Sequence, residues 1–168
     1  LLKSYGYADL AFDTQLPLNA TFEIGSVTKQ FTGVAILQLV EQGKLSLDDE
    51  MTKYVAYNTQ GKKVTIRHLL SHTSGIKGYT ELPMFEKLAM EKHKRDTLLR
   101  LVEKEPFDFE PGEALIYNNT GFFLLGLIIE KVSGLTYEEY VKKNLFEKAG
   151  MDNSYYASER TITKNKAH

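Results

Sequence analysis

The sequence contains no cysteine. This absence excludes disulfides, a thiolate nucleophile and cysteine-containing metal sites, and it is compatible with any compartment. Long hydrophobic runs are also absent. The longest, GFFLLGLII at 121–129, is about half the length of a membrane-spanning helix, so we interpret it as a buried core helix. No signal peptide is visible, but the first residues already alternate like a strand, and a targeting segment is compatible with such a start.

The charge is nearly balanced, with 21 basic and 22 acidic side chains and a formal net charge of −1. This balance does not point to a polyanion, so we expect no nucleic-acid partner. The basic cluster EKHKR at 91–95 is interleaved with acidic residues. We interpret it as a solvated helix face, with a binding patch as the alternative. A length of 168 residues fits one domain.

The pattern is mostly helical, with one clear strand over residues 4–12. Caps and breakers predict helices over the following ranges: 26–42, a short helix after Thr65, 96–103, 120–132 and 136–145. The stretch VAILQLV at 34–40 is apolar on nearly every face and is expected to be central and buried. A single strand has no sheet to join, so we expect part of the sheet to lie outside this chain.

Ser26 and Lys29 open the first long helix. Positions three apart share a helix face, so the ammonium can approach the hydroxyl, which is the geometry of a nucleophile and its activator. The alternative is that Ser26 is only a helix cap, because Ser-x-x-Lys is a weak pattern that recurs as SGIK at 74–77. Gly75 makes that second copy a poor helix, so context favours the first.

Tyr117 and Asn119 form a second candidate pair, in an extended stretch where both side chains project to the same side. A tyrosine near a cationic lysine can transfer protons, and an asparagine amide can hold the lysine and a substrate amide together. The alternative is a half-buried aromatic side chain at Tyr117 and a helix N-cap at Asn119. His68 and His72 are four apart, but they lack the His-Glu-x-x-His pattern and a third ligand, so we expect no metal site.

Three ordered blocks, 24–49, 64–76 and 109–141, resemble the class C type β-lactamase family, with its penicillin-binding-protein and esterase relatives, and GMDNSYY at 150–156 continues the likeness. The resemblance implies that Ser26 is the acylated nucleophile and that Lys29 belongs to the Ser-x-x-Lys motif. Tyr117 and Asn119 match the Tyr-x-Asn motif. The segment HLLSHTSG at 68–75 matches a family hallmark, which the resemblance implies supports the site structurally.

The expected fold class is α+β, a β-lactamase/transpeptidase-like fold represented mostly by its helical region. The expected fold also includes one or two N-terminal strands of an incomplete antiparallel sheet. Family members are longer and have a third motif, Lys-Thr-Gly or a variant, on a later strand. The chain ends at TITKNKAH without this motif. We therefore expect residues 1–168 to be a single partial domain that lacks the C-terminal strands.

The resemblance implies a serine hydrolase that forms an acyl-enzyme, with a β-lactam, D-amino-acid amide or ester as small-molecule or peptide substrate. Catalytic roles fall to Ser26, Lys29 and Tyr117, and substrate binding to Asn119, with no cofactor. The family suggests a bacterial periplasmic, secreted or membrane-anchored location. The alternative is an inactive member or fragment that binds a ligand or self-assembles, either with another copy or with the missing C-terminal half.

Overall fold

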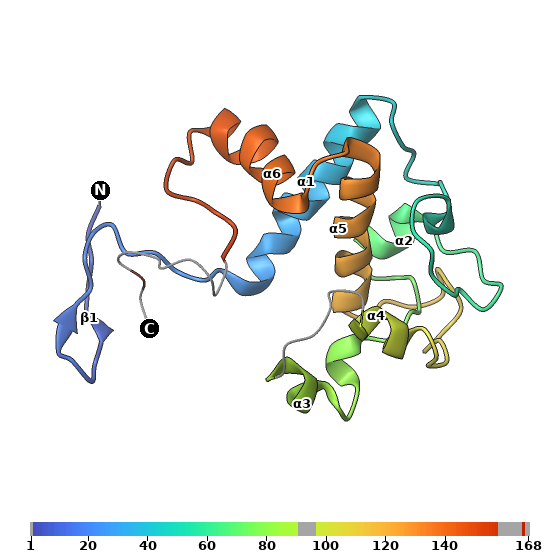
Figure 1. The fold of residues 1–168 in the computed structure, drawn as a ribbon, viewed down its shortest axis with the longest axis horizontal. Coiled ribbons are helices and arrows are strands. Elements are labelled where there is room, and N and C mark those ends of the chain that lie inside the picture. The colour runs from blue at the N-terminus through green and yellow to red at the C-terminus, as the bar shows by residue number, and fades with distance from the viewer. Residues whose placement is uncertain (1, 91–96, 158–165, 167–168) are drawn as a thin grey trace.

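The computed structural model describes residues 2–90, 97–157 and 166. Strands β1 and β2 span Tyr7–Asp9 and Thr14–Gln15. The α-helices are α1 Thr28–Glu41, α2 Ile66–Leu70, α3 Phe85–Ala89, α4 Thr97–Val102, α5 Asn119–Ser133 and α6 Tyr137–Val141. Short helical turns are η1 Gly25–Val27, η2 Met51–Lys53, η3 Tyr79–Glu81, η4 Lys142–Phe146, which is a π-turn, and η5 Glu147–Ala149. The α+β class with a mostly helical body is confirmed (Figure 1).

The N-terminal strand predicted over 4–12 is wrong in its extent, because the chain folds back within it. β1 pairs with β2 in an antiparallel hairpin that lies apart from the helical body (Figure 1). The Asp9 carboxylate accepts hydrogen bonds from the backbone N–H groups of Ala11, at 2.8 Å, and Phe12, at 3.1 Å. An aspartate that bonds the backbone ahead of it favours a turn, which ends the strand early.

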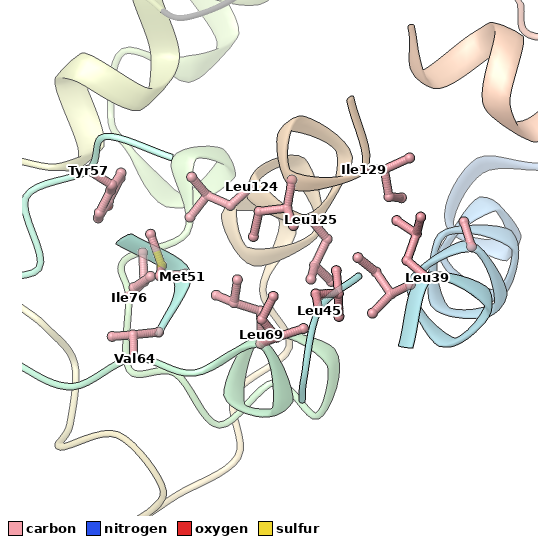
Figure 2. Close-up of a cluster of buried hydrophobic side chains, with 14 of the residues drawn as sticks. Leu39, Leu45, Met51, Tyr57, Val64, Leu69, Ile76, Leu124, Leu125 and Ile129 are labelled. Atoms are coloured by element: carbon pink, nitrogen blue, oxygen red, sulfur yellow. The ribbon is translucent and has the colours of Figure 1, made fainter. Parts of the chain in front are cut away.

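Helices α1 and α5 lie side by side and form the centre of the core (Figure 1). In Figure 2, Leu124 and Leu125 of α5 lie between Leu39 of α1 on one side and Met51 and Ile76 on the other. All five side chains are almost completely buried. Removal of this apolar surface from water is the main favourable term that holds the two helices together.

The prediction that VAILQLV is buried on nearly every face is only partly correct. Ala35, Ile36 and Leu39 have no exposed surface, whereas Val34 and Leu37 are 47% and 48% exposed. The interior residues face the core, whereas Val34 and Leu37 lie on a side of α1 that the described residues cover only in part. The sequence pattern alone does not tell a fully enclosed helix from one with an uncovered apolar side.

The predicted helix ends are largely confirmed. Gly43 and Gly134 follow α1 and α5 with left-handed φ values of +68° and +73°, a backbone conformation in which glycine has no steric cost. Thr65 and Thr136 begin α2 and α6 with capping boxes. The helix predicted over 136–145 differs in its second half, where α6 gives way to the π-turn η4.

The helix predicted over 96–103 is confirmed as α4 within the described residues. The basic cluster at 91–95 lies outside those residues. In the part of the chain that the structure describes, no single helix is long and apolar enough to span a membrane. Asn119–Ser133 and Tyr137–Ala149 together have the length and composition of a span, but these two helices are bent by 77° relative to each other.

A tight turn at Gly75, after α2, packs against the segment that precedes α5. Gly75 has a φ of +72°, and a Cβ atom placed there would lie 2.0 Å from the carbonyl oxygen of Phe109. Its carbonyl also accepts a hydrogen bond from the Asp108 N–H at 2.8 Å. A side chain at this position would therefore separate two segments that approach closely.

We expect Gly75→Ala to lower the free energy of unfolding by more than about 2 kcal/mol, because the left-handed backbone costs roughly 1–2 kcal/mol and the clash adds to it. Gly134→Ala is the matched control. It has a similar φ of +73° but open space around the new methyl group, so only the backbone cost applies. Urea unfolding of the full natural chain measures both, and equal losses would show that the contact with Phe109 does not matter.

Candidate active site

The four residues singled out in the sequence converge at one point of the fold. Ser26 lies in the turn η1 and Lys29 in the first turn of α1. Tyr117 precedes α5, and Asn119 is its first residue. The ends of the two packed core helices therefore bring together residues about ninety positions apart.

Hydrogen bonds connect all four side chains. The Lys29 ammonium donates to Ser26 Oγ at 3.3 Å and to Asn119 Oδ1 at 2.7 Å. The Tyr117 hydroxyl donates to Ser26 Oγ at 2.5 Å. Lys29 Nζ also lies 4.5 Å from the centre of the Tyr117 ring, within the range of a cation–π contact. Ser26 Oγ thus has two proton-transfer groups within reach.

The environment favours the ionised form of Tyr117. The pKa of this phenol lies below its ordinary value, first because it hydrogen bonds with the Lys29 ammonium and second because of its bond to Ser26. When protonated, Tyr117 donates to Ser26. When Tyr117 is ionised, the Ser26 hydroxyl can instead donate to the phenolate. Tyr117 is therefore suited to accept the serine's proton.

Two local predictions at this site are wrong. Ser26 does not open the α-helix itself but lies in the turn η1 before it, and it retains the approach to Lys29. Asn119 is neither extended nor a cap. The N-cap of α5 is Asn118, whose side chain accepts from the Gly121 N–H at 2.8 Å, and this leaves the Asn119 amide to face Lys29.

His72 supports Tyr117, and the sequence reasoning missed this role. Its Nδ1 accepts from the Asn118 N–H at 3.0 Å, and its ring lies 4.7 Å from that of Tyr117. Its carbonyl accepts from the Ile116 N–H at 3.0 Å. A neutral imidazole is needed for the Nδ1 contact. Burial, and then the nearby Lys29 charge, lower the pKa of His72 and favour that neutral form.

The loop after Ile76 borders the site within its described part. Thr80 accepts a hydrogen bond from Asn119 Nδ2 at 3.3 Å. The Thr120 hydroxyl is buried and fixes this loop, because it accepts from the Tyr79 N–H and donates to the Lys77 carbonyl, each at 2.9 Å. A lone threonine in a loop has no pattern that marks such a contact, so the sequence could not identify Thr80.

The second Ser-x-x-Lys copy has a different environment. Ser74 is 1% exposed, and its hydroxyl accepts from the Ile76 N–H at 3.4 Å. Lys77 forms ion pairs with Asp108, at 2.9 Å, and Glu81, at 3.0 Å. The structure therefore separates Ser74 from Lys77, as the glycine between them predicts.

The two histidines considered as metal ligands have separate hydrogen-bonding partners. His68 Nδ1 accepts from the Thr65 N–H at 3.4 Å in the capping box of α2, while His72 contacts Asn118. Among residues 2–90, 97–157 and 166, no three His, Asp or Glu side chains form a group that could hold a metal ion.

A cavity of about 390 Å³ opens beside the four-residue cluster. Its lining includes Ser26, Lys29 and Asn119, and it extends along α1 and α5 toward Tyr137 and Tyr156. This volume is near the lower end of the ~300–1,000 Å³ typical of small-molecule sites.

The sequence was compared with known protein families and curated proteins. The family model described as "Beta-lactamase" matches residues 1–168. Penicillin-binding protein 4* of Bacillus subtilis is 38% identical over 156 residues, which cover 89% of this chain and 33% of that protein. The chain thus spans about a third of the length of this curated relative.

Solved structures of related proteins have a similar fold. A penicillin-binding protein from Bacillus halodurans superposes with a TM-score of 0.87 at 39% identity, over 98% of this chain and 51% of that one. A D-stereospecific amidohydrolase from Streptomyces sp. superposes with a TM-score of 0.70 at 35% identity, over 76% of this chain and 42% of that one.

The lowered pKa of His72 predicts a pH-dependent stability. Below its ordinary pKa of ~6.5, the unfolded histidine binds a proton that the folded one resists, so the free energy of unfolding falls as the pH drops from about 7 to 5. His68, whose pKa burial also lowers, contributes to the same fall.

His72→Asn removes one of these titrations. Asparagine tolerates the φ of +59° and retains an acceptor near the Asn118 N–H, so the fall over this pH window should be smaller. Urea unfolding at several pH values measures the difference. An unchanged pH dependence would show that His72 titrates normally.

Proposed function

The chain belongs to the Beta-lactamase family, and on this premise we propose that Ser26 is a nucleophile acylated by an amide, β-lactam or ester carbonyl. Members of this family are serine hydrolases, including penicillin-binding proteins, amidases and esterases. The observation that supports the proposal is the convergence of Lys29 and Tyr117 on Ser26 Oγ, at 3.3 and 2.5 Å.

In the first step, Ser26 Oγ forms a bond to the carbonyl carbon while its proton passes to the Tyr117 phenolate. Lys29, as ammonium, stabilises the phenolate and the developing charge. The carbonyl oxygen becomes an oxyanion, for which we assign the backbone N–H of Ser26, at the positive end of α1, as one donor.

In the second step, the tetrahedral intermediate collapses and the bond to the leaving group breaks. Tyr117 returns the proton to the leaving nitrogen or oxygen, and an acyl ester of Ser26 remains. Water then attacks the ester carbon while Tyr117 takes a proton from it. As the bond to Ser26 Oγ breaks, Tyr117 returns this proton to Oγ, so that the acid leaves and the serine hydroxyl is restored. In this scheme Tyr117 carries the proton, and Lys29 supplies the positive charge beside it.

Asn119 has a positioning role in this scheme. Its Oδ1 accepts from the Lys29 ammonium at 2.7 Å and fixes the direction in which Lys29 approaches Ser26. Its amide also lines the cavity beside the nucleophile, where it can bond a substrate amide.

We assign residues 1–168 to a single β-lactamase-like domain of which they form the helical part. The chain covers 33% of Penicillin-binding protein 4* and 51% of the solved penicillin-binding protein, which supports this assignment. A second oxyanion donor is expected on a strand outside these residues. The loss of one such donor typically lowers the rate about a hundredfold to a thousandfold. The activity of residues 1–168 therefore depends on whether that strand is present.

Ser26→Ala should abolish covalent labelling by a penicillin and by a fluorophosphonate, because no other group replaces the nucleophile. Lys29→Ala should slow labelling by several orders of magnitude, and Tyr117→Phe by about 10²–10⁴-fold. Intact mass measured against time on the full natural chain reports each adduct. Ser74→Ala, in the second Ser-x-x-Lys copy, should label normally, and a full adduct in Ser26→Ala would contradict the assignment.

A second candidate function is assembly, supported by exposed apolar side chains. Phe22, Ile24, Val27, Val34 and Leu37 are each between 47% and 58% exposed, from the approach to α1 onto its outer side. A contiguous apolar surface of this kind favours association. Residues 1–168 alone should therefore self-associate, and a monodisperse monomer in light scattering at about tens of micromolar would contradict this candidate.

A further inference from the structure

Helix α5 is apolar on two sides. One side enters the core through residues that are nearly inaccessible to solvent, among them Leu124, Leu125 and Ile128. The other side presents Phe122, Phe123, Gly126 and Leu127, which are only half-buried or border the cavity beside Ser26. Phe122, Phe123 and Leu127 also pack against the edge of the core, and their remaining apolar surface borders the cavity.

The cavity continues directly from the proposed nucleophile. Ser26, Lys29 and Asn119 line one end, and Tyr137 and Tyr156 line the other. Its walls are more apolar than polar and rich in aromatic rings, which provide large contact surfaces to a flat group. Tyr117 is not among the lining residues, so it approaches Ser26 from outside this cavity.

Two hydroxyl groups of the cavity lining, those of Thr32 and Tyr137, are engaged with the protein itself. The Thr32 hydroxyl donates to the Thr28 carbonyl at 3.4 Å, and the Tyr137 hydroxyl lies 2.7 Å from Thr32 Oγ1, which leaves Tyr137 as the donor of that bond. The Glu130 carboxylate accepts from the Tyr137 N–H at 2.9 Å. Because these two hydroxyl hydrogens are already bonded, an apolar guest beside Thr32 and Tyr137 leaves neither donor unpaired.

We propose that this cavity binds the acyl side of the substrate, and that the preferred acyl group is aromatic. The inference rests on the proposed function, since it places the guest on the carbonyl carbon that Ser26 attacks. The acyl group points between α1 and α5 past Asn119, while the leaving group lies on the side of Tyr117, which protonates it. The aromatic walls then distinguish an arylacyl substrate from an acetyl one.

Gly126 lines the cavity and lies close to the Tyr137 ring. A Cβ atom at this position would lie 3.7 Å from Tyr137 Cδ2, an ordinary van der Waals contact, so alanine fits without displacement. A leucine extends further into the same space and narrows the passage. Both residues favour helix more than glycine does, so neither substitution weakens α5 by backbone propensity.

The test compares 4-nitrophenyl phenylacetate with 4-nitrophenyl acetate, which share a leaving group and differ only in the acyl group. In the full natural chain, Gly126→Leu should lower the ratio of the two kcat/KM values by about tenfold or more, because contacts in an apolar pocket discriminate by roughly 10–200-fold per methylene. Gly126→Ala should change the ratio by less than about threefold. Leu127→Phe, which adds volume to the wall, should lower it in the same direction.

Labelling of Ser26 by a small alkyl fluorophosphonate should stay within about twofold of wild type in each variant, which separates a blocked pocket from a damaged site. Val34→Leu, on the exposed side of α1 and outside the cavity lining, should leave the ratio unchanged. If Gly126→Leu and Leu127→Phe both leave the ratio unchanged, or lower kcat/KM equally for both esters, the pocket assignment is overturned. Neither outcome would contradict Ser26 as the nucleophile. Hydrolysis that persists in Ser26→Ala would overturn the proposed function, and the pocket assignment with it.

Discussion

The packing of α5 against α1 is the constraint on which the candidate site depends. Ser26 and Lys29 lie at the start of α1, and Tyr117 and Asn119 lie at the start of α5, so the register between the helices sets the distances among their side chains. Burial of leucine and isoleucine side chains fixes that register. The 2.7 Å bond between Lys29 and Asn119 is its direct result and would not survive a shift of one helical turn, about 5.4 Å.

A second layer of contacts holds the approach to α5. His72 binds this segment through its ring nitrogen and its carbonyl, and Asn118 bonds the Ile76 carbonyl at 2.5 Å while it caps the helix. The close turn at Gly75 brings these segments together. Tyr117 is 49% exposed, so backbone and ring contacts, and not burial, hold it against Ser26. A lowered pKa in an exposed phenol therefore depends on its neighbours.

The two sides of α5 explain how one helix contributes both to the core and to the candidate site. Its core side is closed by side chains from α1, α2 and the segments near Met51 (Figure 2). Its other side borders the cavity beside Ser26. An apolar lining costs little stability here because aromatic rings partly cover one another, as Tyr137 and Tyr156 do with ring centres 6.0 Å apart. The same helix thus positions Asn119 and shapes the adjacent space.

The sequence by itself determined the helix caps, the glycine helix ends and the four polar residues of the site, because these depend on local backbone chemistry and short spacings. It also identified the family through its ordered blocks, and family models and relatives confirm this. Only the tertiary structure decided that the first strand folds back at Asp9, that Asn118 and not Asn119 caps α5, and that Val34 and Leu37 are exposed. The contacts of His72 and Thr80 with the site also appeared only there. The exposure of Val34 and Leu37 and the contacts of His72 and Thr80 depend on which segments meet across long sequence separations, and short spacings do not reveal that. The turn at Asp9 and the cap at Asn118 are local, but the sequence pattern alone did not choose between Asn118 and its neighbour Asn119.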